Sequence, residues 1–339
     1  MLKIRRFVRC AAQIRSLVDD ALQTASQHFK DGDIRQCITS NLRIFEDKIP
    51  ITVLNDGNMW LKVASARINT AFAYKLLGEF DHALDQVKEG IKLLDAHFTQ
   101  CKPELCHALD LCAELYIAAG KHSEAQEYVS RSLEIKTSIY PQQSPHLVNS
   151  YNLQGAIHFA AGRLAEAEAE FMKSISICVN NYGFETPINQ QLGVTLSNLA
   201  GIWRARDDWK KCIEAYTAVV TSFEAHFGES SWMTAQASVD LGLSLVNAGA
   251  PRAAKEHLVR GLGILVTTSG PSHPSAVAAM EALKATQNPA GEDAALECAF
   301  LSDLFRQVKI EKKGKVSGDL YILDRRGHVG GGHPFSQLK

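Results

Sequence analysis

The sequence lacks the short motifs that usually accompany an enzyme active site. It has no Walker phosphate loop, no His-Glu-x-x-His zinc helix and no Gly-x-Ser-x-Gly nucleophile elbow. It also lacks an Asn-x-Ser/Thr glycosylation sequon and any apolar run long enough to cross a bilayer. Nothing assembles a nucleophile, a base and an orienting group. We therefore expect a non-enzymatic protein with no cofactor and no transmembrane segment.

The eight cysteines include no Cys-x-x-Cys pair and no spacing typical of a disulfide framework. This usage fits free thiols in a reducing compartment. His97, Cys101, Cys106 and His107 lie close together in the sequence, but their spacing matches no common zinc module. The sequence therefore predicts no metal site.

The formal net charge is only -1, but it is unevenly distributed. Residues 1–18 carry five basic side chains and no acidic one, and residues 306–339 carry eight basic and three acidic. Each end thus has a net charge of +5, which leaves -11 for the middle. A protein that follows a phosphate backbone needs a basic stripe along its binding surface. The acidic middle argues against a nucleic-acid partner.

A glycine returns along the chain at a nearly constant interval. Gly78, Gly120 and Gly162 are 42 residues apart, and Asp207 and Gly249 repeat this spacing. A small residue follows each of these positions after five residues, and a proline follows four of the five after 25 residues. Such a period is the signature of a helical-repeat array. We expect an all-α, right-handed superhelical solenoid of helix-turn-helix repeats.

Six repeats can be aligned, with a degenerate cap after them. Their first helices are predicted to end near Gly32, Gly78, Gly120, Gly162, Asp207 and Gly249. A loop containing Pro50 lengthens the first interval, and about three extra residues, close to one helical turn, follow Pro187. The seventh repeat is partial, with its two helices predicted at residues 274–287 and 292–309. A degenerate last helix pair is expected of a terminal repeat, which has to face water on one side. The solenoid would thus cover residues 18–309, and the basic, glycine-rich residues 310–339 would form a disordered tail with one short strand at 320–323.

The repeated residues resemble the tetratricopeptide repeat. That family has a small residue in the first helix, an aromatic three positions later, a glycine at the turn and an alanine five residues beyond it. In the second repeat these places are filled by Ala71, Tyr74, Gly78 and Ala83. The small residues would let the two helices of a unit approach, and the aromatic rings would fill the gaps between units. The 42-residue period, longer than the usual value of about 34, resembles the kinesin light chain subtype.

The resemblance implies a concave groove in which a peptide or helix of a partner protein binds. Carried over to this sequence, the groove positions include Asn69, Lys75, Asn149, Asn152, Asn198, Arg204, Asp240 and Asn247. Gln236 falls on another groove position. Amide side chains both donate and accept hydrogen bonds, so they suit a peptide backbone. The alternative is that these are solvated polar residues on exposed helix faces.

Residues 1–17 form a basic segment that is amphipathic on a helical wheel. Ile4, Phe7, Val8, Ala11, Ile14 and Val18 lie on one side, and Arg5, Arg6 and Arg9 lie opposite. This pattern resembles a mitochondrial transit peptide, although Arg15 lies inside the apolar sector. The other interpretations are a helical extension of the first repeat and a contact with a membrane surface. We expect a mitochondrial location, with the cytoplasm as the alternative.

The expected function is that of a scaffold or adaptor, such as a mitochondrial assembly factor or a peripheral subunit of a larger complex. Chaperone-binding members of the family use a carboxylate clamp with asparagine at the ninth position of a first helix. Here that position holds Ser26, Phe72, Glu114, Ala156, Gly201 and Leu243. A chaperone tail is therefore not expected as the partner. The alternative is an RNA-associated protein resembling the pentatricopeptide group, whose repeats are shorter and present a basic face.

Overall fold

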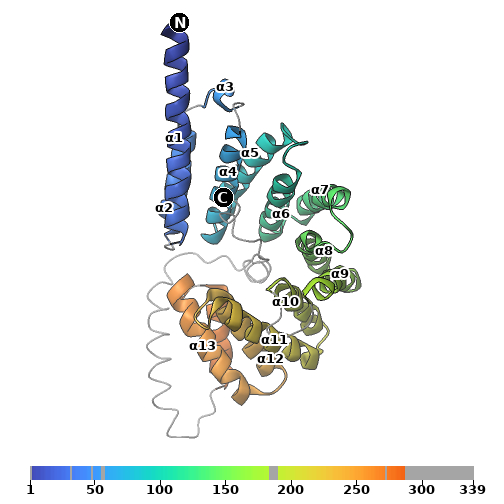
Figure 1. Ribbon diagram of the computed structural model, residues 1–339. Coiled ribbons are helices and arrows are strands. Elements are labelled where there is room, and N and C mark those ends of the chain that lie inside the picture. Colours follow the sequence, from blue (N-terminus) through green and yellow to red (C-terminus); the bar gives the residue numbers. More distant parts are fainter. Residues whose placement is uncertain are drawn as a thin grey trace. The chain divides into compact units, whose positions relative to one another are not determined.

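The computed structural model describes residues 2–30, 33–46, 49–54, 58–182, 190–271 and 273–286 (Figure 1). Within these ranges every regular element is a helix and none is a strand. The chain divides into two compact units, with the boundary between Gln142 and Gln143. The prediction of an all-α chain of helix pairs is confirmed.

The first unit consists of three helical hairpins. Its helices are α1 (Leu2–Lys30), α2 (Ile34–Glu46), α3 (Ile51–Leu54), α4 (Met59–Leu76), α5 (Phe80–Asp95), α6 (Lys102–Ala118) and α7 (His122–Ile139). The pairs α1–α2, α4–α5 and α6–α7 pack together, and α2–α4 and α5–α6 join adjacent hairpins. We call the first helix of each pair the A helix and the second the B helix. The one-turn helix α3 lies in the loop expected around Pro50 and was not predicted.

The second unit repeats this arrangement. Its elements are η1 (Pro145–Leu147), α8 (Val148–Ala160), α9 (Leu164–Tyr182), α10 (Gln190–Ala205), α11 (Trp209–Phe227), α12 (Trp232–Asn247), α13 (Pro251–Ser269) and α14 (Pro274–Thr286). The pairs are α8–α9, α10–α11 and α12–α13, and α14 packs on α13. The first helix of the predicted cap is thereby confirmed. Its second helix, the segment after Pro187, the tail and its strand lie outside the described residues.

Each predicted turn residue that the structure describes takes the left-handed backbone conformation, and Gly32 lies outside the described residues. The φ angle is +72° at Gly120 and +57° at Asp207, where the other four turns of this kind have glycine. The next amide then donates back to the first helix, as in the bond from Asp208 N to Trp203 O at 2.9 Å. This is the Schellman arrangement, which satisfies carbonyls left open at a helix end. The glycine register therefore marks where the A helices stop.

We predict that Asp207→Gly stabilises the second unit by roughly 0.5–1 kcal/mol. A side chain in the left-handed region is strained, whereas glycine adopts this conformation freely; part of the gain is offset by the greater freedom of glycine in the unfolded chain. Urea unfolding followed by circular dichroism measures the difference. The reciprocal Gly120→Asp should destabilise the first unit, and equal stability of both variants and the wild type would contradict the argument.

Small residues bring the two helices of a repeat close together, as the sequence predicts. A Cβ placed on Gly155 in α8 would lie 2.5 Å from the ring of Phe171 in α9. Between repeats, Tyr74 of α4 packs against the core of the first hairpin, which contains Cys37 of α2. Cys37 has no exposed surface, and burial raises the pKa of its thiol to about 11. It serves as a small apolar residue at this position.

Candidate ligand-binding face

The predicted groove residues of the first unit are buried and are not solvated. Asn69 and Lys75 both belong to α4, and each is less than a tenth exposed. The ammonium of Lys75 lies 2.5 Å from a carboxylate oxygen of Glu114 in α6. This ion pair joins neighbouring A helices and neutralises the charge that Lys75 would offer a ligand. The Nδ2 of Asn69 has no hydrogen-bond partner.

A second buried ion pair holds α6 against its own B helix. The Nζ of Lys136 lies 2.6 Å from Oδ2 of Asp110, and Ser132 donates to Oδ1 of the same carboxylate at 2.6 Å. All three side chains are buried. Lys136 and Ser132 were not predicted from the sequence, because they lie on a B helix, outside the groove positions. Their spacing of four residues on α7 would have placed them on one helix face.

In the second unit the predicted residues lie on three successive A helices. Asn149 and Asn152 belong to α8, Asn198 and Arg204 to α10, and Asp240 and Asn247 to α12. They differ in exposure: Asn152 and Asp240 are buried, Asn149, Asn198 and Arg204 are half-buried, and Asn247 is exposed. The helices α8, α10 and α12 therefore belong to the second compact unit, whereas Asn69 and Lys75 belong to the first.

Hydrogen bonds hold several of these side chains in place. Asn152 donates from Nδ2 to the hydroxyl of Thr195 at 3.0 Å, which links α8 to α10. Gln236 donates from Nε2 to Asp240 at 3.1 Å, within α12. Asn247 donates to the backbone carbonyl of Leu243, so this hydrogen bond stays within α12. Thr195 was missed in the sequence because it occupies none of the positions that the family uses.

One amide on each of these A helices keeps a polar atom that lacks a partner. These atoms are Oδ1 of Asn152, Nδ2 of Asn198 and Oε1 of Gln236, all with almost no exposed surface. Asn152 is 1% exposed and Gln236 is 8% exposed. An unsatisfied buried polar atom costs about 1–3 kcal/mol. An acceptor, a donor and an acceptor thus follow one another over α8, α10 and α12.

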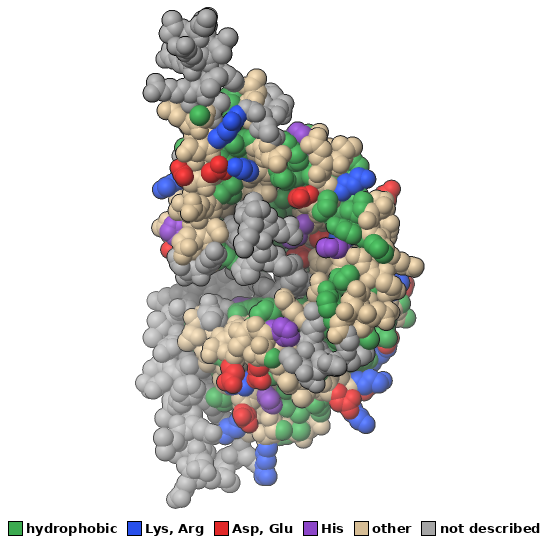
Figure 2. All heavy atoms as spheres, viewed as in Figure 1, with side chains coloured by type: hydrophobic (Ala, Val, Ile, Leu, Met, Phe, Trp, Pro, Cys, Tyr) green, Lys and Arg blue, Asp and Glu red, His purple; other side chains and the backbone are tan. Residues whose placement is uncertain are grey.

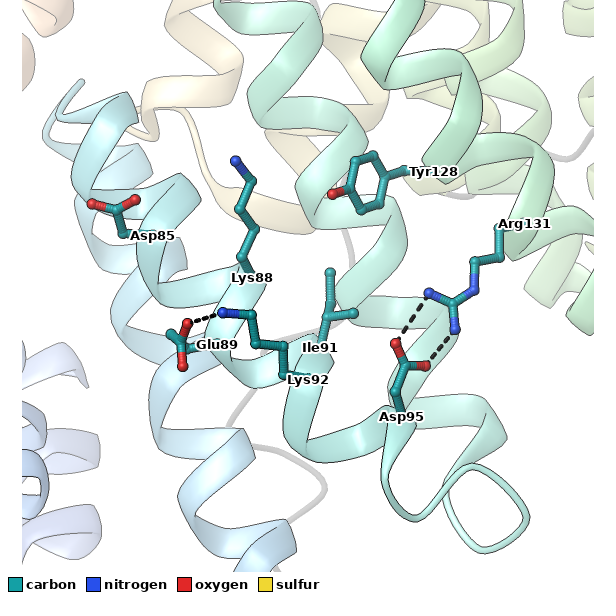
Figure 3. Close-up of a pocket in the computed structure, with 8 residues that line it drawn as sticks. All are labelled: Asp85, Lys88, Glu89, Ile91, Lys92, Asp95, Tyr128 and Arg131. Atoms are coloured by element: carbon teal, nitrogen blue, oxygen red, sulfur yellow. Dashed lines mark hydrogen bonds and ion pairs between the residues drawn. The ribbon is translucent and has the colours of Figure 1, made fainter. Parts of the chain in front are cut away.

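A separate open pocket lies between two B helices of the first unit. Its volume is about 480 Å³, and its lining includes Lys92 and Asp95 of α5 and Tyr128 and Arg131 of α7 (Figure 3). Arg131 forms a two-pronged ion pair with Asp95, while Lys92 pairs with Glu89 at 2.5 Å. These charges largely satisfy one another. The pocket therefore offers a ligand fewer unpaired polar groups than the A helices do.

The described residues carry neither a cluster of metal-ligating side chains nor a membrane-spanning helix. On the face seen in Figure 2, acidic and basic side chains are interspersed. Within the described ranges no group of three or more His, Cys, Asp and Glu side chains is placed to hold a metal ion. No helix in those same ranges is both long and apolar enough to cross a bilayer.

The family profile of the tetratricopeptide repeat matches residues 104–178, which run from α6 into α9. This segment, which spans two consecutive hairpins, is similar to tetratricopeptide repeats. The hairpins α4–α5, α10–α11 and α12–α13 share its turn geometry at Gly78, Asp207 and Gly249. The 42-residue, kinesin light chain-like subtype of tetratricopeptide repeat stays a prediction. A comparison with curated proteins gave no match.

Solved structures are similar to this chain in fold at low sequence identity. The structure of NprR in complex with its cognate peptide NprX has a TM-score of 0.61 and 12% identity, covering 94% of this chain and 92% of that one. The apo form of RapI has a TM-score of 0.54 and 10% identity, covering 86% and 99%. BtubC from P. vanneervenii has a TM-score of 0.52 and 15% identity, covering 76% and 92%. These similarities establish the fold.

Proposed function

We propose that this chain is a non-enzymatic scaffold that binds an extended segment of a partner protein along α8, α10 and α12. The observation that carries the proposal is the series of unpartnered amide atoms on Asn152, Asn198 and Gln236. A buried polar atom that lacks a hydrogen-bond partner lowers the stability of the folded protein. A ligand that supplies the missing partners would recover that free energy on binding.

The order of these atoms suits a polypeptide backbone. The acceptors on Asn152 and Gln236 would receive ligand N–H groups, and the donor on Asn198 would bind a ligand carbonyl. α8 and α10 pack against each other, and packed helices lie about 8–10 Å apart, which an extended chain covers in roughly three residues at about 3.3 Å each. A segment of about seven residues would contact all three helices if the step from α10 to α12 is similar. Recognition through the backbone favours a ligand of mixed rather than strongly charged sequence.

In the first unit, Lys75 and Lys136 are neutralised by Glu114 and Asp110, so they offer no free cation to an acidic segment. The ninth position of the A helices holds no asparagine, which disfavours a chaperone tail. NprR, with which this chain shares its fold, was solved with a bound peptide. This supports a peptide segment of a protein as the partner.

The proposed role is that of an assembly factor or peripheral complex subunit in mitochondria. Its support is the basic, amphipathic sequence of residues 1–17. Organelle fractionation of the native protein tests the location. Recovery in the cytoplasm alone would overturn the mitochondrial part of the proposal and leave the scaffold part standing.

We predict that Asn198→Leu together with Gln236→Met weakens partner binding by about 10- to 100-fold, since each hydrogen bond lost contributes about 0.5–1.5 kcal/mol. The partner is first recovered by affinity purification after nuclease treatment. Its binding segment is then titrated against wild type and variant by calorimetry. Gln236→Met also removes the hydrogen bond from Nε2 to Asp240, so circular dichroism has to show that the variant keeps the helical fold of the wild type.

The matched control makes the same changes on B helices, Gln126→Met with Asn180→Leu, and should bind as the wild type does. Equal losses in both double variants would contradict the proposed site. Nuclease-sensitive recovery of RNA, with binding that weakens steeply as salt rises, would instead favour the RNA-associated alternative.

A further inference from the structure

The helix α2 carries an asparagine at a core position where the other B helices carry a larger, mainly apolar residue. The B helices can be aligned on the small residue five positions after each predicted turn residue, which is Cys37 in α2 and Ala83 in α5. Four residues farther along, the side chain is at most 2% exposed in every B helix. In α2 this position holds Asn41, and in the others it holds Val87, Val129, Phe171, Tyr216 and Leu258. Of the six hairpins that the structure describes, only the first thus places an amide at this point of its core.

Asn41 is completely buried and has no hydrogen-bond partner. Its exposed fraction is 0%, and neither Oδ1 nor Nδ2 is hydrogen-bonded. One turn before it, Cys37 and Ile38 pack in an apolar cluster with Ala73 of α4, and one turn after it, Ile44 packs in a second apolar cluster with residues of α1 and α4. An unsatisfied buried polar side chain favours a state in which water reaches it, by roughly 10- to 100-fold in the opening equilibrium. The amide of Asn41 therefore weakens the packing of the first hairpin.

Apolar contact with α4 is the main interaction that keeps the first hairpin in place. Both α1 and α2 pack on α4. The ion pair between Asp19 of α1 and Lys62 of α4 is at the surface, with side chains 52% and 39% exposed, and ion pairs of this kind contribute little stability. In a repeat array each hairpin contacts only its neighbours, so one hairpin can separate while the others stay folded.

We infer that the α1–α2 hairpin is a cover that separates from α4 as one unit while α4 to α7 stay folded, and that the amide of Asn41 sets how often it does so. Separation uncovers an apolar face of α4 that includes Met59, Val63, Ala66 and Ala73, each less than a tenth exposed in the closed form. Elements that move to admit a partner are drawn from the least stable parts of a fold. The opening is independent of the ligand face on α8, α10 and α12, which belong to the other compact unit.

The test is amide hydrogen exchange of the full chain at several low urea concentrations, for the wild type and for Asn41→Leu. In the wild type, the amides of α1 and α2 should exchange faster than those of α4 to α7 and depend less on urea, because a partial opening exposes less surface than global unfolding. Leucine keeps the branched shape of asparagine without its polar atoms. Asn41→Leu should therefore slow exchange in α1 and α2 by roughly 10- to 100-fold and leave exchange in α12 and α13 unchanged. Asn41→Val, which introduces the residue found in α5 and α7, should act in the same direction.

The reverse change, Leu258→Asn, is the matched control, because Leu258 occupies the same position in α13 and is also 0% exposed. It should speed exchange in α12 and α13 and leave α1 and α2 unchanged. Three results would overturn the inference. The first is exchange in α1 and α2 with the rate and urea dependence of α4 to α7. The second is unchanged or faster exchange there in both Asn41 variants, and the third is unchanged exchange in α12 and α13 in Leu258→Asn.

Discussion

Asp110→Ala is expected to destabilise the first unit by about 3–5 kcal/mol, because it leaves the ammonium of Lys136 buried without its counter-charge. In the wild type this ammonium lies 2.6 Å from the Asp110 carboxylate, and Ser132 donates to the same group. All three side chains are buried, so water cannot replace the lost carboxylate. Urea unfolding gives the overall change, and amide hydrogen exchange should locate it in α6 and α7.

The double variant Asp110→Leu with Lys136→Met is the control for this prediction. Replacing both partners of a buried ion pair by apolar residues is often neutral or stabilising. We therefore expect the double variant to regain most of the stability that Asp110→Ala loses. If the double variant is as unstable as the single one, packing rather than the unpaired charge causes the loss.

Gly261→Ala is expected to destabilise the second unit by roughly 1–3 kcal/mol, the usual range for overpacking. Gly261 lies on α13 where it crosses α12. An added Cβ would lie 2.7 Å from the carbonyl oxygen of Ala235 and 2.7 Å from a methyl group of Val239. The carbonyl is part of the α12 backbone, so the helices would have to move apart. Thermal unfolding followed by circular dichroism measures the effect.

Gly263, two residues farther along α13, provides the matched control. No atom lies within 4 Å of the position that its Cβ would occupy. Gly263→Ala should therefore stabilise the helix by roughly 0.5–1 kcal/mol, the ordinary advantage of alanine over glycine. Similar effects of the two substitutions would show that close helix contact does not determine which glycines of α13 are required.

The helix pairs and their turns could be predicted because each repeat carries the signals for them in its own sequence. A turn such as that at Gly120 requires a residue that tolerates positive φ, and Asp207 shows that the register persists where glycine is absent. Local signals of this kind act over a few residues. The helix α3 was missed because four residues give too little periodicity to separate a helix from a loop.

The side-chain partners of the candidate site could not be predicted in the same way. The register places Lys75 on a groove position, but its partner Glu114 is 39 residues away on the next A helix. Whether a polar residue faces solvent or a neighbouring helix depends on how successive hairpins rotate, and the repeat pattern does not encode this. The same holds for Asn152, whose bond to Thr195 crosses a segment of irregular repeat length.

Hydrogen–deuterium exchange with and without the partner segment tests most directly whether recognition takes place on the A helices. We expect slower amide exchange in α8, α10 and α12 when the segment is bound, with little change in α9, α11 and α13. Slower exchange in α5 and α7, around the pocket of Figure 3, with none on α8, α10 and α12, would contradict it.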